Sequence, residues 1–568
     1  MRLDLYQKVA VEATGKRVAV SACPGSGKTR TIVSRFVHMV RNRIPDAHIA
    51  LITFTRYAAN EMLSRLDQFQ RYAYVGTIHA FALRMIMMWG DELGWNPEWL
   101  TVLDEEEAAQ DEKTVLIDCG LMNREGKWKK LRAYQWHAFK LSVIEGVPLP
   151  DGFPGRYLPQ CERAWSAFSK RLKAENCITF GMLVLEAIKL FDIPRAADAL
   201  RTRYQHVLLD EAQDTNKMQW KLIYALEPKT MFVVGDADQS IYEWRGANPK
   251  LFVDYCTCPA VERHDLPCSY RFGINIAAPA SNLIKHNSNR LERSIQAISN
   301  NEGILDVMSG AAYEDVADII TTELRNGRPP HEIAVLARKH ATLDHLEGVL
   351  KGREGVEYGR IGGRFSIPKS VQYRTIRGYL RLAINPADRR AFMAIAAAEN
   401  IPEHKLISMR IECVASKSTL FHVYGKKLPQ RLDAIQDYLE EHDTLTDYTK
   451  ACRYIREMSF YHGCQNTQEI VHMMAMQSLQ DQLSRTRSKV TLGTIHAFKG
   501  LEADCVLVIG ANQKDFPAKR SVTEGKIEEE RRLAYVAMTR ARERLYLVSG
   551  ESRGVAYEPS QFLMEAGE

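Results

Sequence analysis

The sequence lacks the features of membrane-spanning, secreted and disulfide-stabilised proteins. No apolar run reaches the roughly 18–20 residues that a bilayer-spanning helix needs, and the opening "MRLDLYQKVA" has no apolar core of a secretory signal. The eleven cysteines among 568 residues are scattered rather than arranged as a framework. We therefore expect a cytoplasmic protein that makes no contact with a membrane.

Metal-ligand clusters and strong net charge are also scarce. The closest cysteines, Cys256, Cys258 and Cys268, lack the fourth ligand and the tight spacing of a zinc or iron–sulfur site, so we interpret them as reduced thiols. Basic residues exceed acidic ones by only six, 76 against 70, which permits a nucleic-acid partner without requiring one. At roughly 100–200 residues per domain, the length predicts three or four domains.

The segment "VAVSACPGSGKTRTIVSRFVHMV" has the pattern of a phosphate-binding loop between a strand and a helix. Residues 18–21 predict the strand, and the apolar spacing from residue 31 onward predicts the helix. Glycines let backbone amides surround phosphate oxygens, and the helix N-terminus adds partial positive charge. Lys28 is suited to the β- and γ-phosphates, and Thr29 to Mg²⁺. The expected phosphate-binding residues are Ala22, Cys23, Pro24, Gly25, Ser26, Gly27, Lys28 and Thr29.

This loop departs from the strict pattern, which has glycine where Ala22 stands. A glycine turn before an ordinary helix is the plain alternative. Cys23 replaces another usual glycine, and it makes the loop either redox-sensitive or simply tolerant of a small residue.

A second motif, "YQHVLLDEAQDTNKMQW", places two acids after a short apolar strand at residues 207–209. Asp210 and Glu211 then lie at the carboxyl end of the strand, where open α/β sheets bind ligands. Asp210 is suited to Mg²⁺, and Glu211 to orienting and deprotonating an attacking water. Two exposed acids in a turn are the alternative. Beside the phosphate loop, the pair favours hydrolysis, with water rather than a small molecule as acceptor.

Six segments together resemble one known family. In chain order they are "ACPGSGKT", "DEAQD", "VVGDADQSIYEWRGA", "SYRFG", "GTIHAFKGLEADCVLV" and "EEERRLAYVAMTRARERL". Their order and spacing resemble the motifs of superfamily 1 helicases, most of all the UvrD/Rep/PcrA-like group. They extend over nearly the whole chain, which makes the resemblance far more specific than any single motif.

The resemblance implies an α/β fold with two RecA-like P-loop motor domains, each with an inserted, mainly helical subdomain. The expected ranges are 1–88 and 200–268 for the first motor domain, 89–199 for its insertion, 269–392 and 488–568 for the second motor domain, and 393–487 for its reduced insertion. The reduced size puts the regulatory role of that insertion in doubt. We also expect no C-terminal nuclease domain. The basic and aromatic stretch at 127–136 suits either DNA contact or a solvated helix face.

Nucleotide contacts follow from the same resemblance. Gln7 matches a glutamine that reads adenine, and Tyr270 matches an aromatic residue stacked on the base. Glu502 matches an acid near the ribose, and Arg30 a residue near the base. Ordinary core packing is the alternative for Tyr270.

Residues of the second half are expected to complete the catalytic site. Arg271 matches a cation on the γ-phosphate, Gln239 a γ-phosphate sensor, and Arg540 an arginine that stabilises transition-state charge. Surface ion pairs are the alternative for both arginines.

DNA contacts are implied at several motifs. Trp244 is the strongest candidate for stacking on unpaired bases, and Phe54 matches a second aromatic contact. The family commonly has Asn-Lys where Arg56 and Tyr57 stand, so Phe54 and Thr55 are the firmer matches. The expected DNA-binding residues are Phe54, Thr55, Thr77, His79, Tyr242, Trp244, Arg245, Thr494 and His496.

The hexapeptide "GTIHAF" occurs twice, at 76–81 and 493–498. By resemblance, each copy is a loop at the end of a strand in one motor domain, and both face the same DNA backbone. The threonine hydroxyls suit phosphate contacts. Only the second copy continues as "KGLE", so only it is expected to reach the nucleotide. Coincidence between two short loops is the alternative.

The expected activity is that of a 3′–5′ DNA helicase that uses ATP and Mg²⁺, with polarity implied by the resemblance alone. The expected partners are single-stranded DNA, junctions of single- and double-stranded DNA, and repair or replication proteins, at the nucleoid if the source is a bacterium or phage. One alternative is a single-stranded-DNA translocase that removes bound proteins and unwinds little. A distant alternative is a P-loop kinase for a small molecule.

Overall fold

The computed structural model describes all residues except 1–2, 67–68, 130, 362–370, 386–387, 399–400, 417–454, 456–458, 460–463, 476–488, 514, 553–554 and 568. Residue contacts divide the chain into two compact units. The unit that we call the sheet unit comprises Met1–Ile78, Ala199–Gly363 and Ser478–Glu568. The helical unit comprises His79–Asp198 and Arg364–Gln477.

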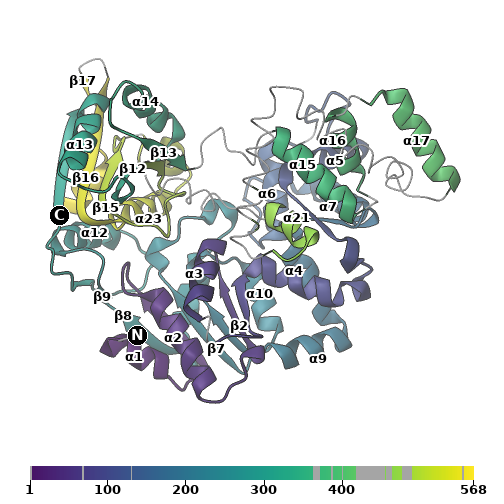
Figure 1. The fold of residues 1–568 in the computed structure, drawn as a ribbon, viewed down its shortest axis with the longest axis horizontal. Helices are drawn as coiled ribbons and strands as arrows, with labels where there is room; N and C mark the ends of the chain where they lie inside the picture. The colour runs from purple at the N-terminus through teal and green to yellow at the C-terminus, as the bar shows by residue number, and fades with distance from the viewer. Residues whose placement is uncertain are drawn as a thin grey trace. The chain divides into compact units, whose positions relative to one another are not determined.

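The first sheet of the sheet unit has six parallel strands in the order β3-β2-β6-β7-β1-β8. Figure 1 labels β2, β7 and β8 of this sheet. Its strands are β1 (Arg17–Ala22), β2 (Ile49–Thr53), β3 (Tyr74–Thr77), β6 (His206–Leu209), β7 (Thr230–Gly235) and β8 (Glu262–Leu266). The helices of this part are α1 (Leu5–Glu12), α2 (Lys28–Arg41), α3 (Arg56–Leu66), α10 (Lys217–Ala225) and α11 (Pro249–Thr257), and α9 (Pro194–Arg203) leads into it. Strands β1 and β2 are buried almost throughout, as expected for parallel strands covered on both faces.

The second sheet has the order β11-β16-β15-β12-β14-β13, also parallel, and a short β17 pairs antiparallel with β16. Its strands are β11 (Ile304–Ala311), β12 (Ile333–Ala337), β13 (Tyr358–Ile361), β14 (Val490–Thr494), β15 (Ala503–Ile509), β16 (Ala541–Ser552) and β17 (Val555–Ala556). The helices are α12 (Ile274–Lys285), α13 (Tyr313–Arg325), α14 (His340–Leu350), α22 (Lys519–Thr523), α23 (Ile527–Met538) and α24 (Gln561–Gly567). A two-stranded ladder, β9 (Cys268–Ser269) with β10 (Gln296–Ala297), lies between the two sheets in the chain.

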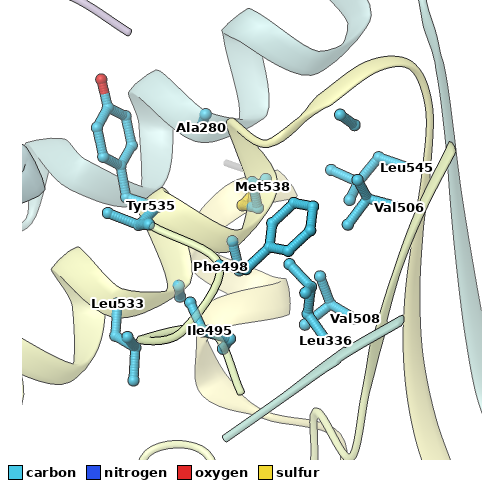
Figure 2. Close-up of a cluster of buried hydrophobic side chains, with 14 of the residues drawn as sticks. Ala280, Leu336, Ile495, Phe498, Val506, Val508, Leu533, Tyr535, Met538 and Leu545 are labelled. Carbon is cyan, nitrogen blue, oxygen red and sulfur yellow. The ribbon is translucent and has the colours of Figure 1, made fainter. Parts of the chain in front are cut away.

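One core of the sheet unit lies under α23, where Phe498 packs among side chains of β12, β15 and β16 (Figure 2). Ile241, Tyr242 and Ala247, which follow β7 of the first sheet, belong to the same buried cluster. The first sheet therefore contributes a loop to the core of the second.

The helical unit is built from both inserted segments. Its elements are α4 (Ile78–Trp89), β4 (Thr101–Leu103), α5 (Glu105–Asp118), α6 (Ala133–Ile144), α7 (Leu158–Ala174), β5 (Cys177–Thr179), α8 (Met182–Lys189), α15 (Val371–Ile384), α16 (Arg389–Ala398), α17 (Glu403–Ser416) and α21 (Thr467–Ala475). Buried Arg381, on α15, forms ion pairs with Asp388 and with Glu107 of α5. A buried His472 ring nitrogen lies 2.9 Å from the Leu100 carbonyl. Polar contacts therefore bind the two insertions together.

The predicted α/β class with two parallel P-loop-type sheets is confirmed. The division by contacts differs from the predicted ranges, because α15 and α16 pack in the helical unit although the prediction places residues 371–392 in the second motor domain. Residues 417–454, the middle of the expected second insertion, lie outside the described residues. Within the stretch at 127–136, Trp136 is buried and its indole nitrogen donates to Glu112, whereas Tyr134 is exposed. That stretch is therefore partly core.

Candidate active site

The phosphate loop joins β1 to α2 in the predicted place. Gly25 and Gly27 have φ values of +76° and +79°, a left-handed region that glycine enters without strain. The Ser26 hydroxyl donates to the Cys23 carbonyl at 2.7 Å, and Thr31 donates to Gly27 at 3.1 Å. These bonds hold the loop in shape ahead of the helix N-terminus. Ala22 and Pro24 are buried in it, Thr29 lies in the first turn of α2, and Arg30 is exposed there.

Gln7 holds the loop from outside. Its side-chain Nε2 donates to the Ser26 carbonyl at 2.9 Å, and its Oε1 accepts from the Asp4 backbone at 3.2 Å in the capping box of α1. A Cβ atom on Gly27 would lie 2.7 Å from Gln7 Nε2, so this approach requires glycine. The sequence predicts that Gln7 reads adenine, and the structure adds that its amide supports the phosphate loop.

Cys23 lies buried within the phosphate loop. Burial raises the pKa of its thiol to about 12, and the thiol donates to the Pro267 carbonyl at 3.3 Å. A thiol held protonated in the interior is a poor nucleophile and oxidises slowly. These surroundings favour a tolerated small residue over a redox-sensitive one at this position.

Asp210 and Glu211 lie at the carboxyl end of β6, beside Lys28. Burial, reinforced by the Glu211 charge, raises the pKa of Asp210 to about 7 against the opposing charge of Lys28. Thr53 donates to Asp210 Oδ2 at 3.2 Å, whereas no hydrogen bond reaches the buried Oδ1 from the part of the chain that the structure describes. An orphaned carboxylate oxygen with a raised pKa is the environment in which a cation would be stabilising.

Glu211 is held in a strained conformation. Its φ of +51° lies in the left-handed region that non-glycine residues rarely adopt, a form of strain that is typical of functional sites. Gln213 Nε2 donates to Glu211 Oε2 at 2.5 Å. Burial would raise the pKa of Glu211, but Lys28, Lys499 and the Gln213 amide outweigh it and lower that pKa. The side chain is therefore ionised at neutral pH and able to accept a proton.

Residues of the second half reach this site through Gln239. The Gln239 amide donates to Asp236 at 2.5 Å, and its oxygen accepts from Arg540 Nη2 at 2.9 Å. Arg540 follows α23 and is fully buried. Burial and the nearby Arg271 lower the pKa of Arg540 to about 9, which leaves it mainly cationic at neutral pH. The predicted sensor and the predicted arginine thus touch each other.

Arg271 and Tyr270 lie over the phosphate loop. The Tyr270 backbone donates to the Gly25 carbonyl at 3.0 Å, and a Cβ on Gly25 would come within 2.6 Å of the Arg271 side chain. Arg271 also donates to Glu502 at 2.7 Å and to the Thr539 carbonyl at 2.9 Å. Tyr270 is 45% exposed, which excludes the core-packing alternative. Burial would raise the pKa of Glu502, but Arg271 and Arg542 lower it.

The donor set fits a divalent ion of the magnesium type. No group of three or more His, Cys, Asp or Glu side chains converges among the described residues, Cys256, Cys258 and Cys268 included. Mg²⁺ is commonly held by one or two protein groups together with substrate phosphates, so a cage of protein ligands is not needed. Asp210 Oδ1, which accepts no hydrogen bond from the described residues, meets that lower requirement together with Thr29, which follows Lys28 in the first turn of α2.

Two cations of the site were not predicted from the sequence. Lys499 donates to both carboxylate oxygens of Asp214, at 2.7 and 2.5 Å, and to the Gln239 carbonyl at 2.6 Å. Arg293 donates to the Ala22 carbonyl at 2.8 Å and pairs with Asp236. The "KGLE" continuation of the repeat was the available signal for Lys499, and no motif pointed to Arg293.

Four aromatic side chains from three motifs of the sheet unit lie close together and form what we call the aromatic group: Phe54, Tyr242, Trp244 and His496. Phe54 stacks on Tyr242 at a ring-centroid distance of 5.1 Å, and Trp244 meets His496 edge-on at 6.4 Å. The Arg245 guanidinium lies 4.8 Å from the indole centroid. Trp244 is 51% exposed and so presents an aromatic surface to a ligand.

The expected DNA-binding residues differ in burial and in their local contacts. Tyr242 is only 7% exposed, its hydroxyl donates to the His496 carbonyl at 3.1 Å, and its ring packs against Phe54 and Lys499. It therefore supports the loop rather than facing solvent. The Thr494 hydroxyl is also buried, and it accepts from the Ala497 backbone at 3.4 Å. Thr55 caps α3 by accepting from Ala58 at 3.1 Å.

Both copies of "GTIHAF" follow the carboxyl end of a parallel strand. Thr77 ends β3 and Thr494 ends β14, which places the copies at equivalent edges of the two sheets. Their histidines differ in surroundings. His79 stacks on Phe180 at 4.0 Å within the helical unit, whereas burial, with Arg338 nearby, lowers the pKa of His496 to about 3. The His496 ring is therefore neutral at physiological pH.

Comparison with known proteins gives a consistent picture. Residues 3–256 match the model of the UvrD/REP helicase N-terminal domain, and residues 398–552 match that of the UvrD-like helicase C-terminal domain. The chain is 28% identical over 625 aligned positions to the ATP-dependent DNA helicase PcrA of Bacillus subtilis, covering 97% of this chain and 83% of the relative. It is 26% identical over 642 positions to PcrA of Staphylococcus aureus strain MRSA252, covering 100% and 86%.

Among the described residues, no helix combines the length and the apolar composition of a membrane span.

The motifs, the two parallel sheets and the two matching domain models agree in their order along the chain. This chain therefore belongs to the UvrD/REP family of superfamily 1 helicases.

Proposed function

We propose that this protein is an ATP-dependent DNA helicase that moves on single-stranded DNA with 3′ to 5′ polarity and couples Mg-ATP hydrolysis to unwinding. The observation that carries the proposal is the composite pocket. Arg540 of the second half bonds to Gln239 of the first, and Arg271 packs over Gly25 of the phosphate loop. Hydrolysis in such a pocket depends on how the two sheets meet, which is what a motor requires.

The chemistry follows from the ionisation of the site residues. Ionised Glu211 is suited to take the proton of the attacking water, and Lys28 to bind the β- and γ-phosphates. Arg271 and Arg540 supply positive charge where negative charge develops in the transition state. Gln239 would sense the γ-phosphate, because its amide already bridges Asp236 and Arg540.

Thr29 and Asp210 would hold Mg²⁺, which neutralises phosphate charge during transfer. The orphaned oxygen of Asp210 and its raised pKa support this assignment. In the base pocket, Tyr270 is exposed enough to stack on adenine, and Gln7, Arg30 and Glu502 lie on the elements that surround the phosphate loop.

Single-stranded DNA would contact the aromatic group around Trp244. Stacking on an aromatic face holds an unpaired base by roughly 1–3 kcal/mol without reading its sequence. Arg245 adds a cation beside the indole, and Phe54 and His496 complete the surface. Thr55, Thr77, Thr494 and His79 remain candidate phosphate contacts at the strand ends, with Thr494 acting through the backbone of its turn.

A translocase that removes bound proteins and unwinds little is the second candidate. The observation that favours it is the polar network that joins the two insertions inside the helical unit, since it restrains one insertion against the other. Either activity acts on single-stranded DNA or on its junctions with duplex, in the cytoplasm or nucleoid, and repair or replication proteins are its natural partners. A small-molecule kinase explains neither Trp244 nor Arg540.

The test measures ATP hydrolysis with and without single-stranded DNA, followed by strand displacement on duplexes with 3′ or 5′ tails. We expect strong stimulation by DNA and unwinding from 3′ tails only, with Lys28→Ala as the inactive control. Stimulation without displacement would identify the translocase. Absence of stimulation would exclude both motors, and unwinding from 5′ tails alone would contradict the polarity.

A further inference from the structure

The turn that carries Trp244 is held by one helix of the second half. Buried Arg532, on α23, donates from Nε to the Ser240 carbonyl at 2.9 Å and pairs through Nη2 with Glu243. These contacts lie on either side of the buried Tyr242 and just before the exposed indole. Arg532 itself is buried away from the solvent that DNA would occupy, so its effect on DNA must pass through Trp244.

Other residues of α23 lie beside the same turn. Burial, reinforced by the Glu243 charge, raises the pKa of the Glu529 carboxyl group, which places Glu529 close to Glu243. Glu528, one turn before Arg532, lies 3.8 Å from its Nη1 atom. The short helix Glu243–Arg245 ends at Gly246, whose φ of +88° closes the turn. The turn that carries Trp244 is therefore fixed from α23 at two points, Ser240 and Glu243, both through Arg532.

The same helix leads directly to the nucleotide site. Arg540 stands two residues after the end of α23 and bonds to Gln239, the residue before Ser240. The segment from Gln239 to Glu243 is thus bound at its start by Arg540 and at Ser240 and Glu243 by Arg532. A shift of α23 relative to the first sheet must move both arginines together.

We propose that Arg532 is a positioning residue that locks the Trp244 turn to α23, so that nucleotide-dependent movement of Arg540 displaces the stacking indole. The inference rests on the proposed function and names the link between its two sites. The inference requires that Arg532 act on DNA through Trp244. A residue that only stabilises the fold would not show this dependence on Trp244, so an experiment can separate the two roles.

The test is a double-mutant cycle on DNA-stimulated hydrolysis. Arg532→Met should lower the ratio of stimulated to basal turnover about tenfold and raise the concentration of oligo-dT needed for half-stimulation. In a Trp244→Ala background, the same substitution should cause less than a twofold further change, because the link then has nothing to position. Such non-additivity is the signature of residues acting as a unit.

Arg531→Met is the matched control. Arg531 precedes Arg532 on α23 and is likewise buried, but it pairs with Glu565 of α24 at 2.8 Å and bonds to Asn287. Its loss should lower the thermal midpoint as Arg532→Met does while leaving the stimulation ratio within twofold of wild type. Should Arg532→Met fail to fold, Glu243→Ala removes the other, half-exposed end of the ion pair and should give the same non-additivity.

Multiplicative losses in the double variant, or an equal loss of stimulation in Arg531→Met, would overturn the inference while leaving the helicase proposal intact. A wild-type protein that DNA does not stimulate would overturn both, and it would be recognised before any variant is compared.

Discussion

Two buried carboxylates in this molecule, Asp388 and Asp210, differ in how many of their oxygens accept hydrogen bonds. In the helical unit, Asp388 accepts hydrogen bonds from Arg381 at 2.8 and 2.5 Å and from the Arg390 and Ala391 backbones at 3.1 and 3.0 Å. In the sheet unit, one Asp210 oxygen accepts no hydrogen bond from any residue that the structure describes. A filled carboxylate holds segments together, whereas an unfilled one beside a phosphate loop is suited to bind and react.

The surroundings of the two carboxylates also differ in strain and ionisation. Burial opposes charge on Arg381, but Asp388 and Glu107 outweigh it and raise its pKa. The pKa of Asp210 instead rises to about 7, and its neighbour Glu211 stands at a left-handed φ. Substitutions around Asp388 should therefore cost stability, and those around Asp210 should cost activity.

The largest expected effect is that of Glu211→Gln. Removing the general base should lower turnover by about 10²–10⁴-fold, the usual contribution of such a group. Folding stability should change much less than turnover, because relief of the charge beside the buried Asp210 opposes the loss of contacts with Lys28, Lys499 and Gln213. Turnover by quenched flow and urea unfolding of the same preparation check both parts. Activity within tenfold of wild type would contradict the role of Glu211.

The reverse pattern is expected for Arg381→Met. This change leaves Asp388 buried without its cation, which should cost about 3–5 kcal/mol of unfolding free energy. Urea unfolding followed by circular dichroism measures the loss, and Arg381→Met/Asp388→Leu should recover part of it. Arg520→Met, which breaks the exposed pair with Glu524, serves as the control and should show no measurable change. Equal midpoints for the two arginine variants would disprove the structural role.

A smaller and pH-dependent effect is expected for Asp210→Asn. Because the folded pKa of Asp210 lies near 7, above its unfolded value, the folded state holds an extra proton between about pH 4 and pH 7. Wild-type stability should therefore fall as pH rises through this window, and the variant should escape that fall. The gain of the variant at pH 8 over pH 5 should be at most about 3 kcal/mol, because a tenfold change in a proton-binding equilibrium corresponds to about 1.36 kcal/mol.

Thermal unfolding of both proteins from pH 5 to pH 8, without nucleotide or divalent ions, tests this linkage. A constant difference between the two midpoints across that range would show that Asp210 is ionised throughout. Mg²⁺ with a nucleotide should stabilise the wild type at pH 8 and leave the variant nearly unchanged, because the variant lacks the carboxylate.

The smallest effect concerns His496. Its pKa of about 3 keeps the ring neutral, so His496→Gln should leave the pH dependence of DNA affinity between pH 6 and pH 8 unaltered, although affinity itself falls a few-fold. Fluorescence anisotropy with labelled oligo-dT measures both quantities. A change in the slope of affinity against pH on substitution would mean that the ring is charged in the DNA-free protein.

Much of the fold and part of the site were predictable from local sequence. Asp210 and Glu211 follow the end of β6, and Lys28 begins α2 after the glycine loop, as the apolar runs and glycines predicted. The contact of Arg540 with Gln239 followed only from the family resemblance, since 301 residues separate them. The pairing of Arg293 with Asp236 was missed because nothing local marks it.

Burial by distant segments accounts for side chains whose surroundings could not be predicted from local sequence. The sequence predicts Tyr242 at the DNA surface, but Phe54 and Lys499 pack against its ring, and both come from distant segments. The repeated hexapeptide also shows that local sequence does not determine the environment of a side chain. His79 and His496 have the same local sequence and different neighbours. Local sequence sets the strand end, and tertiary contacts decide what each side chain does there.

The central claim is that arginines of the second half complete the nucleotide pocket of the first. Turnover by Arg540→Ala, measured with saturating single-stranded DNA beside the affinity for a fluorescent ATP analogue, tests it most directly. We predict a loss of turnover of at least about 10³-fold, the scale of an arginine that stabilises phosphoryl transfer, with affinity changed by only a few-fold. Turnover close to that of the wild type would contradict the composite site.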